Sequence, residues 1–232
     1  MIKTWIFPIA GNGMRTKALG EYKPFIEVKG KKIIEWFLQS IKGKIKPGDA
    51  VYFVTTENFE KLYNVTKTLK KIIGCEVIIS KDTPVGPAKT ISLALDKTPD
   101  ESEVIICNSD QYISFDEKYC GDIGLVCNVD VGNSKSYFAV ENGRVTDVKE
   151  KENISCIASA GVYMFKQAKL AKQNLAKLYE SNMKTNGEYY IAPSINFSLD
   201  KEISLIPAKL KLDMGTVDNI KYFETHLENL ID

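Results

Sequence analysis

Residues 4–28 read Thr-Trp-Ile-Phe-Pro-Ile-Ala-Gly-Asn-Gly-Met-Arg-Thr-Lys-Ala-Leu-Gly-Glu-Tyr-Lys-Pro-Phe-Ile-Glu-Val, an apolar run followed by a glycine-containing loop. The apolar run Trp5–Ala10 is short enough to be a buried strand. It ends in Gly11-Asn12-Gly13 and a loop that carries Arg15 and Lys23. Bare backbone N–H groups of such a glycine loop can close on a phosphate. Two cations in one loop suggest a triphosphate rather than a single carboxylate.

Helical and strand-like patterns alternate after this loop, up to about residue 115. Strands are expected at 50–55, 75–80 and 104–107, and helices at 31–43, 57–73 and 88–96. The alternation predicts an α/β fold with a Rossmann-like, doubly wound, mostly parallel but mixed sheet and helices on both faces. Ligands of such sheets bind outside the carboxyl ends of the strands. The Gly11 loop, the Pro84–Gly86 loop and Asp110 all fall at that edge.

The second half of the chain carries shorter strand-like runs. They are expected at 122–129, 136–140, 145–149, 158–165, 203–206 and 210–212, with helices at 167–180, 188–199 and 216–230, the last capped by Thr216. No linker, low-complexity tract or repeat separates the halves. We therefore expect one domain over 1–232, with a nucleotide-binding half (1–115) and a smaller, β-rich, acceptor-binding half (116–232).

Charge and composition exclude several classes of protein. A formal net charge of +1 offers no broad footprint for nucleic acid or an anionic membrane. No apolar run approaches the ~18 residues that span a bilayer, and the first strand follows Met1 too closely for a signal peptide. Five cysteines without C-x-x-C spacing predict reduced thiols, buried at Cys75 and Cys107, and a cytoplasmic location. The single histidine, His226, argues against a His-rich metal site.

The glycine loop differs from the dinucleotide fingerprint G-x-G-x-x-G, because Thr16 stands in place of the third glycine. This argues against a Rossmann dehydrogenase. A tight turn without a ligand is the plainer interpretation of two glycines. Arg15 and Lys23-Pro24 favour phosphate binding instead.

Further segments follow in a recognisable order. They are Pro8–Arg15, Tyr22–Ile26, Asn108–Ile113, Lys149–Lys151 with Ser159–Tyr163, and Leu212–Asp218, which is similar to a D-x-G-T-x-x-D element. This series resembles the signature of the sugar-1-phosphate nucleotidylyltransferases, above all members that serve capsule or surface polysaccharide. The resemblance covers nearly the whole chain and implies a Mg²⁺-dependent enzyme that joins a nucleoside triphosphate to a small phosphorylated acceptor and releases pyrophosphate. Such an acceptor arrives ionised, so no serine, cysteine or histidine need activate it.

The resemblance also implies a role for individual residues. Arg15 and Lys23 would be catalytic, and Asp110 and Asp213 would hold Mg²⁺ through hard oxygen ligands. The nucleotide would lie against Ala10, Gly11, Asn12, Gly13, Met14, Arg15, Lys23, Gly86 and Ser109. The acceptor would lie against Glu150, Lys151, Gly161 and Glu188. Plainer interpretations exist for several of these: a solvated charge run at 149–152, a Pro-Val-Gly-Pro turn at Gly86, and a helix start at Glu188.

Departures from the family pattern leave the substrates open. Met14 stands where Thr or Ser is usual, Tyr22 where proline is usual, and Glu152 where proline is usual. A CTP-dependent cytidylyltransferase acting on a non-sugar phosphate, such as phosphocholine or phosphoglutamine, is the first alternative. A GT-A-like glycosyltransferase would use Asp-x-Asp, but Asn108 stands in place of the first carboxylate. A non-catalytic nucleotide-binding regulator would not need all the predicted catalytic and metal residues. A homodimer is expected only from the frequency of dimers among soluble proteins.

Overall fold

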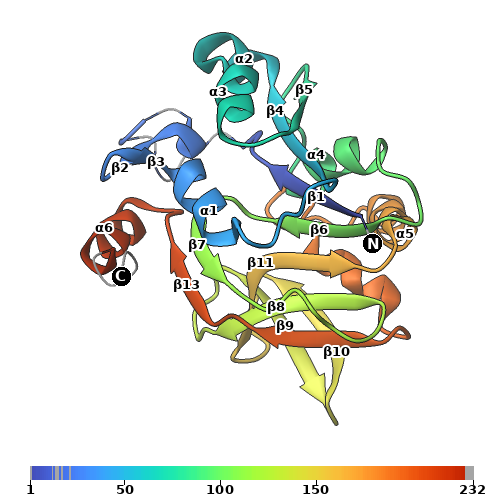
Figure 1. Ribbon diagram of the computed structural model, residues 1–232. Helices are drawn as coiled ribbons and strands as arrows, with labels where there is room; N and C mark the ends of the chain where they lie inside the picture. Colours follow the sequence, from blue (N-terminus) through green and yellow to red (C-terminus); the bar gives the residue numbers. More distant parts are fainter. Residues whose placement is uncertain (1, 12, 14–15, 17, 21, 228–232) are drawn as a thin grey trace.

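The computed structural model describes residues 2–11, 13, 16, 18–20 and 22–227, and its elements are shown in Figure 1. The strands are β1 (Lys3–Pro8), β2 (Glu27–Val28), β3 (Lys31–Lys32), β4 (Ala50–Thr56), β5 (Glu76–Ser80), β6 (Glu103–Cys107), β7 (Gln111–Ser114), β8 (Ile123–Val129), β9 (Ser136–Glu141), β10 (Arg144–Glu150), β11 (Ile157–Phe165), β12 (Ile203–Pro207) and β13 (Leu210–Asp213). The α-helices are α1 (Ile33–Ile41), α2 (Glu57–Tyr63), α3 (Val65–Ile72), α4 (Pro87–Leu95), α5 (Ala168–Glu180) and α6 (Val217–His226). Two 3₁₀ helices are η2 (Lys23–Phe25) and η3 (Ala192–Ser198).

The central sheet is mixed and takes strands from both halves of the chain. Its order in the described residues is β10-β9-β11-β6-β1-β4-β5, and β8 and β12 continue from β11 as a branch. The strands β6-β1-β4-β5 pair in parallel, as strands joined by helical crossovers must. The junction between the halves is β11, which is antiparallel to both β6 and β8. The predicted α/β fold with a mixed central sheet is confirmed.

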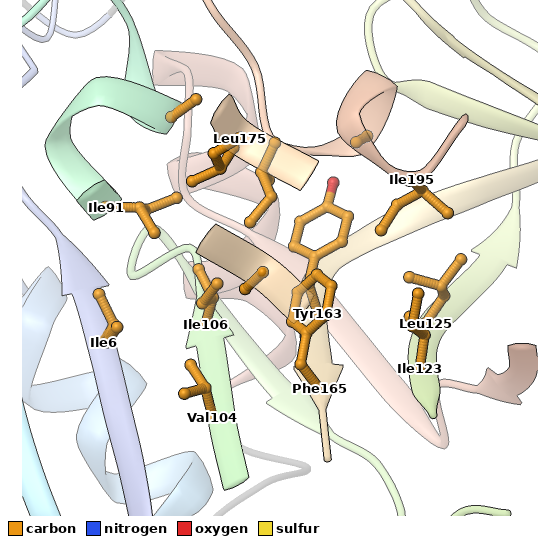
Figure 2. Packing of buried hydrophobic residues seen from close by; sticks show 14 of the residues in the cluster. Ile6, Ile91, Val104, Ile106, Ile123, Leu125, Tyr163, Phe165, Leu175 and Ile195 are labelled. Carbon is orange, nitrogen blue, oxygen red and sulfur yellow. The ribbon is translucent and has the colours of Figure 1, made fainter. Parts of the chain in front are cut away.

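The apolar run that opens the chain is buried because both faces of β1 are covered. Successive side chains of a strand point to opposite faces. Ile6 packs in the core cluster with α4, α5 and η3, while Trp5 and Phe7 pack in the cluster with α1, α2 and α3. Figure 2 shows the first cluster, where Ile6 lies near Ile91 of α4 and beside the strand β6, with β11 on the far side of β6. Helices therefore cover both faces of the sheet.

Two predicted helices differ from the structure. The helix expected over 57–73 is interrupted between α2 and α3 at Asn64, whose left-handed backbone (φ 48°, ψ 50°) ends α2. Asparagine tolerates this conformation better than most residues, so the periodicity continued across the break while the helix did not. The helix expected over 188–199 is only the 3₁₀ helix η3, which has a proline in its first turn. Thr216 caps α6 as predicted, through an Oγ1 that accepts from the Asn219 backbone N–H at 3.2 Å.

Two further features bear on the expectations from composition: the state of the cysteines and the character of the helices. Cys107 is buried and Cys75 partly buried, and none of the five forms a disulfide. Burial raises the pKa of the Cys107 thiol. Across the described residues, none of the helices has the length and apolar character needed to cross a membrane.

Candidate functional site

A cavity of about 190 Å³ lies where β1 and β6 end. Its lining comes from Pro8, Ile9, Gly11, Gly13, Lys23, Pro24, Pro87, Asn108, Ser109 and Asp110. The carboxyl ends of neighbouring parallel strands meet at one edge of a sheet, which is why residues 100 positions apart share this cavity. Of the predicted nucleotide-binding residues, Gly11, Gly13, Lys23 and Ser109 line it. A larger hollow of about 420 Å³ borders the Lys23 segment through Tyr22 and Phe25, but it is lined by none of the predicted site residues that the structure describes.

The cavity contains an ion pair between Lys23 and Asp110. Lys23 Nζ lies 2.7 Å from Asp110 Oδ2, and both side chains are about one-fifth exposed. Gly13 makes the close approach of the loop to this lysine possible. Its φ is +58°, and a Cβ at that position would lie only 3.2 Å from Lys23 Cβ. The glycine loop and Lys23 are thus packed against each other at the carboxyl end of β1.

Lys23 is held in place by the residue before it. Tyr22 is almost fully buried, and its ring stacks on Phe59 of α2 with centroids 4.3 Å apart. Its hydroxyl shares a 3.1 Å hydrogen bond with Thr55 Oγ1 at the end of β4. Burial raises the pKa of Tyr22, so the ring stays a neutral anchor. The tyrosine that replaces the usual proline therefore fastens the Lys23 segment to the sheet and to α2.

A short ladder brings Asp213 to the same edge. Strands β7 and β13 pair antiparallel with Asp213 opposite Gln111, and they run side by side in Figure 1. The Met214 backbone N–H donates to the Asp110 carbonyl at 2.7 Å. The two predicted metal ligands, 103 positions apart in sequence, therefore stand at adjoining ends of paired strands.

Two lysines surround Asp213. Lys211 Nζ contacts Oδ1, and Lys135 Nζ lies 3.3 Å from Oδ2. Burial lowers the pKa of Lys211, although Asp213 opposes the shift. Burial also disfavours the charge of Lys135, but Asp213 and Asp130 outweigh it and raise the pKa of Lys135. No sequence motif singled out either lysine.

The donor set suits Mg²⁺ by type. Within the described residues, no group of three or more His, Cys, Asp and Glu side chains gathers into a cage. Asp110 and Asp213 are two hard-oxygen donors at one strand edge, and Mg²⁺ usually takes one or two carboxylates and completes its shell with phosphates and water. Residues that could hold the ion together with a nucleotide are therefore present.

Three of the predicted acceptor-binding residues, Glu150, Lys151 and Glu188, are hydrogen-bonded to neighbours in the fold. Lys151 Nζ donates to the Tyr190 hydroxyl at 2.6 Å, and that hydroxyl donates to Glu188 at 2.5 Å. Glu150 accepts from the Ser136 hydroxyl. Burial raises the pKa of Glu150, against the opposing effects of Ser136 and Lys151. The segment at 149–152 is thus not simply a solvated charge run, because two of its side chains are bonded within the fold.

The remaining predicted residues have different surroundings. Gly161 lies under Asn108, where a Cβ would come within 2.7 Å of the asparagine amide. A Cβ on Gly86 would come within 2.4 Å of the Tyr189 carbonyl oxygen, so this glycine already has a packing reason. Ala10 is buried. The predicted residues Asn12, Met14 and Arg15 lie outside the described residues.

Sequence reasoning assigned no role to several side chains that contact the predicted site residues or line the cavity. These are Lys135 and Lys211 beside Asp213, Tyr190 between Lys151 and Glu188, and Pro87 and Asn108 on the cavity wall. The Lys-x-Asp spacing at 211–213 places two side chains on one face of a strand and could have been noticed. Nothing near Lys135 in sequence pointed to Asp213.

Comparison with solved structures places this arrangement among known folds. A nucleoside-diphosphate-sugar pyrophosphorylase from Vibrio cholerae RC9 matches with a TM-score of 0.78 and 20% identity, over 95% of this chain and 99% of that one. The chain has the nucleotidyltransferase fold. The inositol-1-phosphate CTP transferase from T. maritima matches at 0.73 and 16% identity, over 94% and 91%. A UDP-glucose pyrophosphorylase complexed with UDP-glucose matches at 0.74 and 17%, over 99% and 100%.

The likeness lies in structure and not in overall sequence. No protein-family model matches the chain. No curated protein matches it either. The fold predicted from the alternation of strands and helices, and implied by the motifs, therefore agrees with structures that are at most 20% identical among those compared above.

Proposed function

We propose that this chain is a Mg²⁺-dependent nucleotidylyltransferase that condenses a nucleoside triphosphate with a small phosphorylated metabolite and releases pyrophosphate. The observation that carries the proposal is the Lys23–Asp110 ion pair in a glycine-lined cavity at the sheet edge, with Asp213 on the adjoining strand. A cation for phosphate and two carboxylates for a metal are the elements that phosphoryl and nucleotidyl transfer need.

The reaction needs positioning and charge neutralisation rather than an activated side chain. An oxygen of the acceptor phosphate attacks the α-phosphorus, the bond from that phosphorus to the bridging oxygen breaks, and pyrophosphate leaves with the electron pair. Lys23 would bind the α-phosphate and the incoming phosphate as a point charge. Arg15, by family resemblance, would bind the leaving pyrophosphate.

Mg²⁺, held by Asp110 and Asp213, would neutralise charge on the phosphates and fix their geometry. The backbone N–H groups of the Gly11–Gly13 loop would cradle the triphosphate. Lys151 would bind the acceptor phosphate, and Glu150 a hydroxyl or amine of the acceptor. The hydrogen-bonded series Lys151–Tyr190–Glu188 supports an acceptor site built from these side chains.

A sugar 1-phosphate is the proposed acceptor, in line with the resemblance to capsule-type enzymes. The inositol-1-phosphate CTP transferase from T. maritima is similar over nearly the whole fold, so CTP with a non-sugar phosphate is the second candidate. We propose that the N-terminal half (1–115) binds the nucleotide and the C-terminal half (116–232) the acceptor.

A pyrophosphate-release screen tests the proposal. ATP, CTP, GTP, UTP and dTTP are each crossed with sugar 1-phosphates, phosphocholine and phosphorylated amino acids, with Mg²⁺ or EDTA. One pair should turn over, and only with Mg²⁺. The matched control is Asp110→Asn, which keeps the side-chain volume and should abolish turnover without unfolding the protein. No turnover by any pair would overturn the proposal, and full turnover by Asp110→Asn would overturn the metal assignment.

A further inference from the structure

Two lysine ammonium groups contact the single carboxylate of Asp213, so the positive charge around it exceeds its own negative charge. Lys211, two residues away on the same face of β13, contacts it, and only 8% of the Lys211 side chain is exposed. Lys135 reaches the other oxygen from the loop between β8 and β9, and its side chain is 23% exposed. Lys211 alone balances the charge of Asp213. Lys135 is the more accessible of the two and is available for another partner.

Lys135 also has a second carboxylate beside it. Its Nζ lies 3.5 Å from Asp130 Oδ2. Asp130 is itself fixed, because its Oδ1 accepts from the Tyr137 hydroxyl at 2.7 Å and from the Gly132 backbone N–H at 2.9 Å. A lysine that left Asp213 would keep this anchor, and its amine would stay close to the strand edge.

The backbone of Lys135 belongs to the acceptor side of the site. Its carbonyl accepts from the Lys151 backbone N–H at 2.7 Å. Lys151 has a left-handed backbone (φ 58°), a conformation that costs energy in a residue with a Cβ and persists only where neighbours hold it. One residue therefore contacts the predicted metal carboxylate through its side chain and supports the predicted acceptor lysine through its backbone.

A divalent cation and an ammonium group compete for the same carboxylate oxygen. An ion that binds at Asp213 would have a higher charge than Lys135 and would displace its amine. Lys211, whose side chain is more deeply buried, would keep its contact with Asp213. The displaced amine would stay next to Asp130, and the backbone of Lys135 is hydrogen-bonded to the backbone of Lys151, the predicted ligand of the acceptor phosphate.

From this we infer that Lys135 is a substrate-binding lysine that pairs with Asp213 until a divalent ion binds there and then contacts the acceptor phosphate. The inference rests on the proposed function and deepens it. It predicts two effects of opposite sign. Loss of the amine should strengthen metal binding in the absence of substrates, yet weaken binding of the acceptor. A purely structural lysine would weaken both together.

The test uses Lys135→Met, which keeps most of the side-chain length, and Lys135→Arg, which keeps the charge. Neither changes the backbone bond to Lys151. Lys172→Met is the matched control, because Lys172 of α5 is similarly exposed and its amine contacts Asp100 and the Thr98 carbonyl instead of Asp213. Mn²⁺ binding to each protein alone is measured by electron paramagnetic resonance, and KM for nucleotide and acceptor by pyrophosphate release with the pair found in the screen.

Lys135→Met should bind Mn²⁺ about two- to fivefold more tightly than wild type, the size expected for loss of one partly exposed ion pair. Its KM for the acceptor should rise roughly tenfold, as for loss of a charge-assisted hydrogen bond, with KM for the nucleotide unchanged. Lys135→Arg and Lys172→Met should match wild type in Mn²⁺ affinity.

Unchanged or weaker Mn²⁺ binding by Lys135→Met would overturn the inference, as would an unchanged acceptor KM or a wild-type protein that binds no Mn²⁺. An equal effect of Lys135→Arg would also overturn it, because shape and not charge would then be responsible. The Mn²⁺ measurement needs no turnover. A failure of the proposed function is therefore visible separately, in the screen, from a failure of the competition at Asp213.

Discussion

Lys23 shows how much one residue depends on its neighbours. The glycine at position 13 leaves room for it, the buried Tyr22 anchors it, and Asp110 pairs with it at 2.7 Å. A long, flexible side chain is thereby held in one geometry before any ligand is present. Such preorganisation is what gives a cation an effect on a transition state rather than on binding alone.

Lys23→Ala should therefore slow the chemical step, by about 100-fold in kcat, the usual scale for loss of one electrostatic contact to a transition state. Rapid-quench measurement of a single turnover separates chemistry from product release. Lys23→Arg is the control that keeps the charge but not its point-like form. A rise in acceptor KM with kcat unchanged would contradict the bridging role.

Elements are joined at this site by very close backbone contacts. Gly86, with φ +89°, begins α4 directly against Tyr189, whose N–H donates to the Val85 carbonyl at 3.2 Å. The loop before α4 and the segment that holds Glu188 and Tyr190 are therefore one packed unit. The loop proposed to face the nucleotide and the segment proposed to face the acceptor thus share a contact that neither sequence motif implied.

Gly86→Ala should destabilise this unit strongly, because its Cβ would lie 2.4 Å from the Tyr189 carbonyl oxygen. We expect a loss of more than about 2 kcal/mol in the free energy of unfolding, since the backbone of Gly86 (φ 89°, ψ 168°) is a conformation that costs about 1–3 kcal/mol in a residue with a Cβ. Urea unfolding measures it. Gly143→Ala is the matched control, with φ +76° and no atom within 4 Å of its Cβ, and should lose only the backbone part. Equal losses would show that the contact with Tyr189 adds nothing.

Asp49 joins the beginnings of β1 and β4. Its carboxylate accepts from the Lys3 N–H and the Trp5 indole at 3.0 Å each, and from the Lys46 N–H at 2.9 Å. Burial opposes the charge of Asp49, but these hydrogen bonds outweigh it and lower the pKa of the carboxyl. A lowered folded-state pKa means that the contribution to stability is present above the ordinary carboxyl pKa of about 4.

Asp49→Ala should thus cost about 2 kcal/mol at pH 7, because it leaves partly buried donors unpaired. The difference from wild type should shrink as the pH falls below about 4 and through the lower folded pKa. Unfolding by urea at pH 7 and pH 3 gives both values. Asp49→Asn, which retains one acceptor oxygen, should lose less. A deficit that stays constant across this pH range would show that the charge of Asp49 is not involved.

At the scale of the whole molecule, the site depends on one sheet built from both halves of the chain. The parallel part supplies the glycine loop and Asp110, and β11 connects it to the antiparallel part. The β7–β13 ladder then brings Asp213 back from near the C-terminus. A ligand that binds this edge touches elements from the first and last thirds of the chain and should stabilise all of them together.

The correct nucleotide with Mg²⁺ should therefore raise the melting temperature of the whole protein in a single transition. At one hundred times its Kd it adds about 2.7 kcal/mol, which corresponds to roughly 5–10 °C for a chain of this size. Differential scanning calorimetry with each triphosphate checks this, and EDTA should remove most of the shift. A nucleotide that turns over but leaves the melting temperature unchanged would contradict binding at this edge.

The sequence by itself determined most of the elements, the α/β class and the strand edge at which we propose that a ligand binds. Hydrophobic period and glycine loops are local, and the order Gly11–Gly13, Lys23, Asp110, Asp213 can be recognised without coordinates. Its errors were local too: the break at Asn64 depends on a single left-handed residue that periodicity does not detect. Only the tertiary structure decided which distant side chains meet, such as Lys135 and Asp213 across 78 residues. That contact forms because the loop between β8 and β9 packs near the end of β13. Contacts between side chains so far apart in the chain result from tertiary packing, and no local sequence pattern predicts them.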